Sequence, residues 1–443
     1  MNRKSTSEDA EHDLKVIRLQ MLVIGILGGG AAIFGSYEGS FFNTYIEHVL
    51  GKDFIYIGVM VSVSAIFGLI FVLVFGTLSD NCRSKLGRRR PYMLFGIIAG
   101  TAMALYGFSP NYWWCFILDA IIIGVASNGF YAATRPLVPD IIPIEDRGRA
   151  NSIVTIFGTI GTLIMAGMAL FVNEFFSYKE VNEEGNVVTI INQPGHILVL
   201  MVGGISIIIV TIIGFIFIKE KKPSDLPPPK KFWEDLSSSF QLEEMKKNKE
   251  FFKIIIAMTI FNTGQRLIAP FLFNYIFDLG LDTIAIILAV VIIAPVVVLG
   301  TIYMGNFSDK YGRKKLVAPT ILISSIGFFM VPFFYPADIF SSLMLVIAVS
   351  LVMLTTTCLL VPLGAWQQDL LPEGKKGQFI GILNIISTVS QIPGAILGGM
   401  IADAYGVAWI FFFVPFFMIG AIPFFIIVKE TLPDKFRKEL DII

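Results

Sequence analysis

Long apolar segments alternate with short polar ones along most of the chain. Twelve of these segments come close to or exceed the length of about 20 residues that a helix needs to cross a bilayer. They lie at 19–45, 55–79, 91–109, 112–135, 150–173, 197–218, 253–277, 284–307, 316–336, 339–368, 378–402 and 405–428. Because lipid offers the backbone no hydrogen bonds, such segments cross a membrane as helices. The pattern therefore predicts an all-α integral membrane protein with twelve transmembrane helices.

Two of the polar connections resemble each other in sequence. GTLSDNCRSKLGRRRPYMLFG (76–96) follows the second predicted span, and GNFSDKYGRKKLVAP (305–319) follows the eighth. Five residues recur, with four extra residues in the first copy: Gly76, Ser79, Asp80, Gly87 and Arg88 correspond to Gly305, Ser308, Asp309, Gly312 and Arg313. Since the copies lie six spans apart, we predict two pseudo-symmetric halves of six helices each.

The predicted organisation has five parts. A tail (1–18) precedes the first half (19–218), a linker (219–252) joins it to the second half (253–428), and a second tail (429–443) follows. In the linker, KEKKPSDLPPPKK is typical of a stiff proline-rich spacer. The next segment, FWEDLSSSFQLEEMKKNKEFFK, is typical of an amphipathic helix on the membrane surface.

Composition supports the membrane assignment and excludes other classes. Of the 443 residues 55% are hydrophobic and only 15% charged, a surplus of apolar surface that a soluble fold of this size cannot bury. The formal net charge is zero, so no nucleic-acid partner is expected. The three cysteines have unrelated spacings, which indicates neither a metal cluster nor a disulfide pair.

The distribution of basic residues predicts the orientation. All but four of the 34 lysines and arginines fall in the tails, or in or at the edge of the connections that follow even-numbered spans. Basic residues in short connections stay on the cytoplasmic side during insertion. Both termini are therefore predicted to be cytoplasmic, in a multi-pass protein of the plasma membrane. The remaining four are Lys52 and Lys179 in the opposite connections and Arg135 and Arg266 within spans.

Three ionisable residues lie well inside predicted spans. Glu38 and Asp119 are each about 10 to 12 Å from the outer end of spans 1 and 4, at 1.5 Å per residue. Arg266 lies near the middle of span 7. A charge at this depth is unfavourable by a few kcal/mol, about 3 on permissive scales, so each is a candidate for function. Glu38 and Asp119 are the predicted ion-coupling residues.

Polar and aromatic stripes supply further candidates. Phe34, Glu38, Phe41 and Tyr45 share one helical face, where rings stack on sugar C–H groups and a carboxylate accepts from hydroxyls. Spans 7 and 11 offer hydrogen-bonding side chains: Asn262, Gln265, Arg266, Asn384, Ser387 and Gln391. The alternative is that the aromatics pack between helices and the polar groups hold the bundle together by hydrogen bonds.

Span 4 carries two polar residues that a regular helix keeps apart. Asp119 and Asn128 are nine residues apart, which is about 180° around a helix. They cannot both face one cavity unless the helix is distorted. Arg135, at the cytoplasmic end of the same span, is the predicted gate or anchor.

These motifs resemble the major facilitator superfamily of transporters over essentially the whole chain. SDNCRSKLGRRRPYMLFG is similar to the glycoside-pentoside-hexuronide:cation symporters and sucrose transporters, as are the segments around helices 4 and 11 and the connector. The resemblance implies a central cavity lined by helices 1, 4, 7 and 10. It also implies a conformational lock in the repeated connections, formed by Asp80, Arg88, Asp309 and Arg313, with Arg135 nearby.

No catalytic set or nucleotide-binding loop occurs in the sequence, and the histidines (His12, His48 and His196) fall outside the predicted spans. We therefore expect neither an enzyme nor a cofactor or metal. The predicted function is a monomeric secondary transporter for a small molecule, a sugar or glycoside, coupled to a proton rather than sodium. The alternatives are a sodium-coupled carrier of lysolipids or other amphiphiles and a non-transporting membrane receptor.

Overall fold

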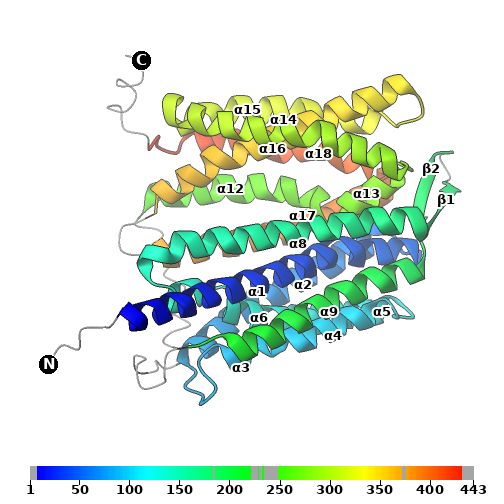
Figure 1. Cartoon of the computed structure of the whole chain (residues 1–443). Helices are drawn as coiled ribbons and strands as arrows, with labels where there is room; N and C mark the ends of the chain where they lie inside the picture. The colour runs from blue at the N-terminus through cyan, green and yellow to red at the C-terminus, as the bar shows by residue number, and fades with distance from the viewer. Residues whose placement is uncertain are drawn as a thin grey trace. The chain divides into compact units, whose positions relative to one another are not determined.

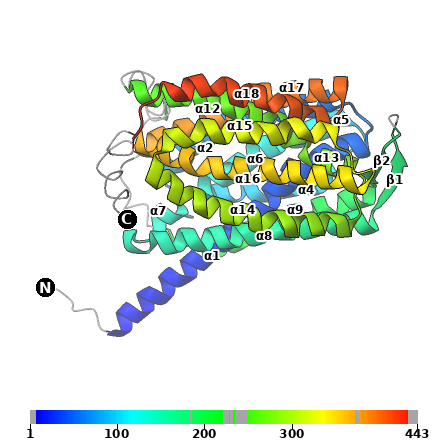
Figure 2. The same ribbon diagram turned by 90° about the horizontal axis from the view of Figure 1, so that it is seen from above.

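The computed structural model consists of long helices and one short hairpin (Figures 1 and 2). It describes residues 7–182, 185–220, 228, 232–233, 248–371 and 376–431, without the side chains of 7–14, 309 and 376–384. The predicted spacer and amphipathic helix of the linker lie largely outside the described residues. The twelve-span prediction is confirmed as an all-helical membrane architecture, in which eleven described helices are long and apolar enough to span a bilayer.

The first half of the chain is divided into thirteen described elements, including a π-helix. The elements are α1 (Ser7–His48), α2 (Phe54–Asn81), α3 (Arg90–Met93), α4 (Phe95–Tyr106), α5 (Tyr112–Phe116), the π-helix η1 (Ile117–Ile123), α6 (Gly124–Thr134), α7 (Leu137–Ile141), the 3-10 helix η2 (Ile144–Asp146), α8 (Arg147–Phe175), β1 (Ser177–Val181), β2 (Val187–Ile191) and α9 (Gln193–Phe217). The predicted third span is divided between α3 and α4, so neither piece is long enough to count as a span alone.

The second half of the chain has fewer interruptions. Its elements are α12 (Lys249–Ile268), the 3-10 helix η4 (Ala269–Phe271), α13 (Leu272–Asp278), α14 (Thr283–Tyr311), α15 (Arg313–Met330), the 3-10 helix η5 (Val331–Phe333), α16 (Ile339–Asp369), α17 (Lys376–Tyr405) and α18 (Ala408–Ile426). The predicted seventh span is thus a helix broken at η4, where Pro270 lies within the first turn and has no N–H to donate.

The described helices form two compact units. The first contains Met1–Gly51, Phe67–Ser177 and Ile191–Ser238, and the second contains Lys52–Ile66, Tyr178–Ile190 and Ser239–Ile443. In the first unit, α1 packs against α8 and α9, and α4 packs against α9. Gly100 and Gly204 bring α4 and α9 together, since a methyl group on either would collide with the other's carbonyl oxygen.

In the second unit, α12 packs against α17 and α18, α15 packs against α16 and α18, and α14 packs against α16 (Figure 2). The beginning of α2 also belongs to this unit, where the Asp403 carboxylate accepts from the N–H groups of Phe54 (2.6 Å) and Ile55 (2.9 Å). A carboxylate at a helix N-terminus satisfies free N–H donors and favours the helix dipole. The hairpin is held by Lys179, whose Nζ lies 2.6 Å from Asp282 Oδ1.

Candidate functional site

Two acidic side chains lie close together inside the first unit. Glu38 is on α1 and half-buried, while Asp119 is in η1 and only 4% exposed. Their carboxyl groups are near enough to interact electrostatically, and Asp119 Oδ1 has no hydrogen-bond partner among the described residues. Within the described part of this unit, no basic side chain forms an ion pair with either carboxyl group. The acidic pair is therefore not neutralised by any described cation of its own unit.

A π-helix surrounds Asp119. In η1, which covers Ile117–Ile123, the N–H of Gly124 donates to the carbonyl oxygen of Asp119, an i→i+5 pattern. Such a segment inserts an extra residue into the helical turn and frequently marks a functional site. The helix is thus distorted between Asp119 and Asn128, where a regular helix was predicted to keep them on opposite faces. Asn128 itself donates to the Gly124 carbonyl at 2.7 Å, within its own helix.

Tyr131 of α6, which was not identified from the sequence, is a further neighbour of the acidic pair. Glu38 interacts electrostatically with Tyr131. The guanidinium carbon of Arg135 lies 4.8 Å from the centre of the Tyr131 ring, a cation–π contact. Tyr131 therefore connects the acidic pair to an exposed arginine at the end of α6. The role of Arg135 as a gate or anchor stays a prediction.

The predicted aromatic stripe is buried. Phe34, Phe41 and Tyr45 are all 0% exposed. The Tyr45 hydroxyl donates to the Ser109 carbonyl at 2.8 Å, and its ring lies 5.5 Å from that of Tyr106. These contacts agree with the alternative in which the aromatics pack between helices, at least for Tyr45. Contact of the stripe with substrate stays a prediction.

Two histidines lie within helices that are long and apolar enough to span a membrane, which corrects their predicted position outside the spans. His196 is in α9 and fully buried, and His48 ends α1. His196 Nδ1 is 3.1 Å from the Asn192 carbonyl oxygen, and its Nε2 is 3.1 Å from Thr44 Oγ1. Because a carbonyl oxygen only accepts, Nδ1 carries the proton. The helix start was missed because Asn192 caps α9 and a proline follows, a signal that precedes the apolar run.

In the second unit the structure brings Arg266 and Ser387 together. Arg266 is on α12 and its Nη2 donates to Ser387 Oγ of α17 at 3.2 Å. The two helices approach closely at Gly394, where an added Cβ would lie 2.7 Å from the Cβ of Arg266. Among the described residues of this unit, no carboxylate forms an ion pair with Arg266. A half-buried guanidinium thus has a neutral hydroxyl as its partner.

The other predicted polar residues of this unit have fewer described contacts. Gln265 is half-buried and its Nε2 lies 3.4 Å from the Met418 sulfur, a weak acceptor. Asn262 and Gln391 are also half-buried. The side chain of Asn384 lies outside the described residues. The contribution of these four to a substrate site stays a prediction.

In the first repeated connection, Arg89 rather than the predicted Arg88 holds the central position. Arg89 is 4% exposed, and its guanidinium contacts Asp80 Oδ1 (2.5 Å), Asp140 Oδ2 (3.0 Å) and Ser79 Oγ (2.7 Å). Arg88 forms an ion pair with Asp140 and with no other residue of the described ranges. The repeat assigned the lock to Arg88 because it follows the glycine. In the structure, the side chain of the next residue, Arg89, links the ends of α2, α3 and α7 through these contacts.

The second connection repeats part of this arrangement. Arg313 forms an ion pair with Asp369 and donates to the Ala365 carbonyl at 3.0 Å, much as Arg89 is 3.5 Å from the Ala132 carbonyl. The side chain of Asp309 lies outside the described residues. Each of the described pairs joins elements of a single unit. The predicted conformational lock therefore stays a prediction.

Two glutamates that the sequence analysis did not identify complete these connections. Glu220 accepts from the N–H groups of Arg88, Arg89 and Arg90 at 2.7 to 2.9 Å, which caps α3. Glu430 accepts from the N–H of Lys314 at 3.0 Å, near the start of α15. Each glutamate follows a lysine just after the sixth or twelfth helix, a repeat in the sequence that could have revealed them.

The Arg89 contacts lead to a stability prediction. We expect Arg89→Ala to lower the free energy of unfolding by about 2 kcal/mol, because it leaves two carboxylates without their buried partner. Arg88→Ala should lower it by about 0.5 kcal/mol, since that residue makes one partly exposed pair. Thermal unfolding of the purified variants in detergent measures both. An equal loss in the two variants would contradict the central position of Arg89.

Helical units with a repeated basic connection and buried charges are typical of a membrane transporter. The family model described as Major Facilitator Superfamily matches residues 22–302 and 287–441, which together cover most of the chain. The chain therefore belongs to the major facilitator superfamily. It is a multi-pass membrane protein and a secondary transporter of small molecules, not an enzyme, so the receptor alternative is not supported.

Individual relatives differ in substrate. The chain is 26% identical to sucrose transport protein SUC3 of Arabidopsis thaliana over 183 residues, which is 36% of this chain and 31% of that protein. It is 22% identical to multi-drug resistance efflux pump PmrA of Streptococcus pneumoniae over 360 residues, 81% of this chain and 82% of the pump. The chain thus matches less than a third of the sucrose transporter's length but most of the pump's.

Solved structures support the fold. The crystal structure of nucleoside transporter NupG superposes with a TM-score of 0.65 and covers 93% of this chain and 98% of that one. The sequence identity is 13%, so this similarity concerns the fold alone.

Proposed function

We propose that the protein is a proton-coupled symporter of a sugar or glycoside in the cell membrane, with both termini cytoplasmic. The observation that carries the proposal is the pair of Glu38 and Asp119 in the first unit, which no described cation of that unit neutralises. Two carboxylates in a poorly hydrated region cannot both be ionised without strong repulsion. Such a pair is suited to hold one proton and exchange it.

Substrate recognition in this proposal uses hydroxyl-binding groups. Arg266 has donors beyond the one that contacts Ser387 and no described carboxylate partner within its unit. A guanidinium donates well to the hydroxyl oxygens of a sugar. The partial similarity to plant sucrose transporters supports this substrate class.

A second candidate is the export of amphiphilic drugs. It is favoured by the similarity to multidrug efflux pumps, which extends over most of this chain. In that case the acidic pair would exchange a proton against a cationic amphiphile. Both candidate functions would use the same two carboxyl groups. They differ in whether the substrate moves with the proton or against it.

Transport by purified protein in proteoliposomes tests the proposal. With acid outside, we expect a radiolabelled sugar such as sucrose, or an aryl glucoside, to accumulate inside by about tenfold for each pH unit of gradient if one proton accompanies each substrate. A protonophore should abolish the accumulation, and a sodium gradient alone should not produce it.

Two outcomes would contradict the proposal. Accumulation driven by sodium and indifferent to pH would exclude proton coupling. Proton-driven movement of ethidium out of the vesicles, without sugar uptake, would support the efflux candidate instead.

A further inference from the structure

The beginning of α2 is packed closely against the end of α17 in the second unit. Two glycines allow this approach. A methyl group on Gly58 would lie 2.4 Å from the Ala395 carbonyl oxygen, and one on Gly399 would lie 2.7 Å from the Phe54 carbonyl oxygen. Both distances are too short for a carbon atom, so the two backbones touch only because these side chains are absent. We call this contact the α2–α17 junction.

Hydrogen bonds connect the same two helices. The Asp403 carboxylate at the end of α17 accepts from the N–H groups of Phe54 (2.6 Å) and Ile55 (2.9 Å) at the start of α2. Deeper in the junction, Ser62 Oγ of α2 lies 2.9 Å from the Ile392 carbonyl oxygen of α17. The first N–H groups of a helix have no partner within the helix itself. In α2 this partner is thus supplied by a different helix.

The Asp403 contact can open without a large penalty. Asp403 is exposed, so water can reach its carboxylate and the first N–H groups of α2 when the helices separate. The other end of α2 is held differently. There Asp80 lies 2.5 Å from Arg89, which is 4% exposed and also binds Asp140. Of the two ends, the one at Asp403 is therefore the easier to release.

Helix α2 belongs to both units of the structure. Residues 54–66 belong to the second unit and residues 67–81 to the first, yet α2 is one continuous helix of 28 residues. Secondary transporters expose their site to the two sides of the membrane by moving one repeat against the other. A continuous helix cannot stay attached at both ends during such a movement. The junction is the end that we expect to separate.

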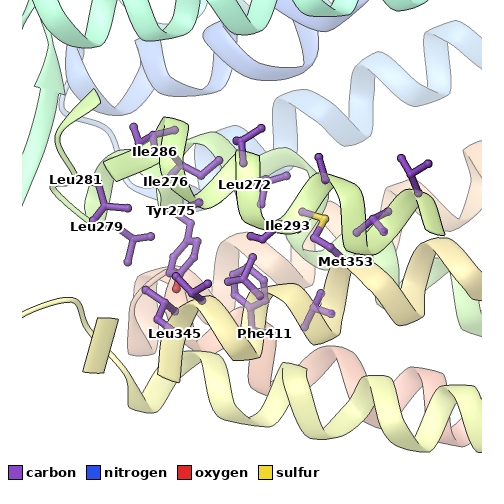
Figure 3. A pocket seen from close by; sticks show the side chains of 18 residues that line it. Leu272, Tyr275, Ile276, Leu279, Leu281, Ile286, Ile293, Leu345, Met353 and Phe411 are labelled. Atoms are coloured by element: carbon purple, nitrogen blue, oxygen red, sulfur yellow. The ribbon is translucent and has the colours of Figure 1, made fainter. Parts of the chain in front are cut away.

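The second unit also contains a cavity, which is lined by other helices (Figure 3). Its volume is about 410 Å³, and its wall is formed by α13 and the turn after it, α14, α16 and α18. No residue of α2 or α17 contributes to this wall. The junction and the cavity are therefore separate features of the unit.

We propose that Asp403 is a latch, whose carboxylate holds the first turn of α2 on α17 and must release it in every transport cycle. Phe54 and Asp403 both lie at the predicted outer ends of their spans, so the latch closes the outer side. Asp403 acts through α2 and is a positioning residue that does not touch substrate. The proposal depends neither on the sugar specificity nor on the coupling ion.

Cysteine accessibility tests the latch without substrate. Ser62→Cys is introduced into a chain whose three native cysteines are replaced by alanine, because Ser62 is 2% exposed and contacts α17. In proteoliposomes, a membrane-impermeant thiosulfonate should label this cysteine about fivefold faster when Asp403→Ala is added, the scale of losing one helix cap. Asp403→Asn, which keeps one acceptor oxygen, should give an intermediate rate. An unchanged rate in Asp403→Ala would overturn the proposal.

Two controls separate a latch from a general support of the fold. Glu180→Gln removes an exposed charge of the same unit, on β1, and should leave the rate at Ser62→Cys unchanged. Ser324→Cys of α15 is fully buried away from the junction and should be labelled equally slowly with and without Asp403→Ala. If labelling of Ser324→Cys rises as much as that of Ser62→Cys, the carboxylate supports the whole unit and is not a latch.

The glycine contact gives an independent variant. Gly399→Ala places a methyl group against a backbone carbonyl, which cannot move aside, so the junction should open and the rate at Ser62→Cys should rise at least about fivefold. Gly76→Ala is the matched control, because an added methyl group there meets nothing within 4 Å. Equal rates in Gly399→Ala and Gly76→Ala would show that α2 does not separate from α17, which also overturns the latch.

Discussion

Asp119→Asn should abolish accumulation driven by a pH gradient while leaving downhill exchange of substrate measurable. The change keeps the size of a side chain that is 4% exposed but removes the carboxyl group that we propose takes up the proton. Glu38→Gln should have the same effect on accumulation, because each carboxyl group raises the cost of a second charge beside it. In proteoliposomes with a gradient of one pH unit, the inside-to-outside ratio of substrate should fall from about ten to about one.

The matched control is Glu174→Gln, an exposed glutamate of α8 in the same unit, which should accumulate substrate normally. Downhill exchange separates a loss of coupling from a loss of folding. At least one of the two site variants should retain it, since substrate can still be bound when the acidic site is permanently neutral. Full accumulation in both Asp119→Asn and Glu38→Gln would remove the acidic pair from the mechanism.

The number and approximate position of the helices could be predicted because apolar length is a direct physical requirement of the bilayer. Interruptions within a span were not predictable in the same way. The break at Leu94 and the π-helix around Asp119 change the pattern of backbone hydrogen bonds but leave the mean hydropathy unchanged. Sequence spacing did show that Asp119 and Asn128 require a distorted helix to share a face, but it did not show that one is present.

Residue pairs were harder to predict than single residues. The repeat identified both connections as candidates for a conformational lock, which stays a prediction, and the structure places ion pairs in each. It pointed to Arg88 because Arg88 follows the repeated glycine, whereas the next residue, Arg89, occupies the buried position. Contacts between distant segments, such as Arg89 with Asp140, depend on tertiary packing, which one sequence does not reveal.

Buried polar groups outside long apolar runs were missed for a related reason. His196 lies in the first turn of α9, whose apolar run starts only at the next residue, so hydropathy alone places it in a connection. Its burial is possible because both ring nitrogens have partners, Asn192 and Thr44.

The second large effect is expected at Arg266. Replacement by lysine keeps the positive charge but loses the planar set of donors, and replacement by alanine loses both. A hydrogen bond to a charged group contributes about 1.5 to 3 kcal/mol, so substrate affinity should fall about 10- to 100-fold in Arg266→Ala. The substrate affinity of Arg266→Lys should lie between the affinities of Arg266→Ala and the wild type. Binding of the transported sugar, followed by isothermal calorimetry on purified protein, measures the loss.

Substitutions at Ser387 and Gly394 test whether substrate binding depends on the position of the Arg266 guanidinium as well as on its presence. Ser387→Ala removes the hydroxyl that receives the Arg266 donor at 3.2 Å, and a loss of about fivefold in affinity is expected. Gly394→Ala adds a methyl group 2.7 Å from the Cβ of Arg266 and 3.0 Å from the Thr263 carbonyl, so α12 and α17 must separate. It should weaken binding and lower the unfolding midpoint together, whereas Ser387→Ala should change binding alone. If Arg266→Ala binds sugar as the wild type does, the guanidinium is a structural partner of Ser387, and the substrate must be held by other groups.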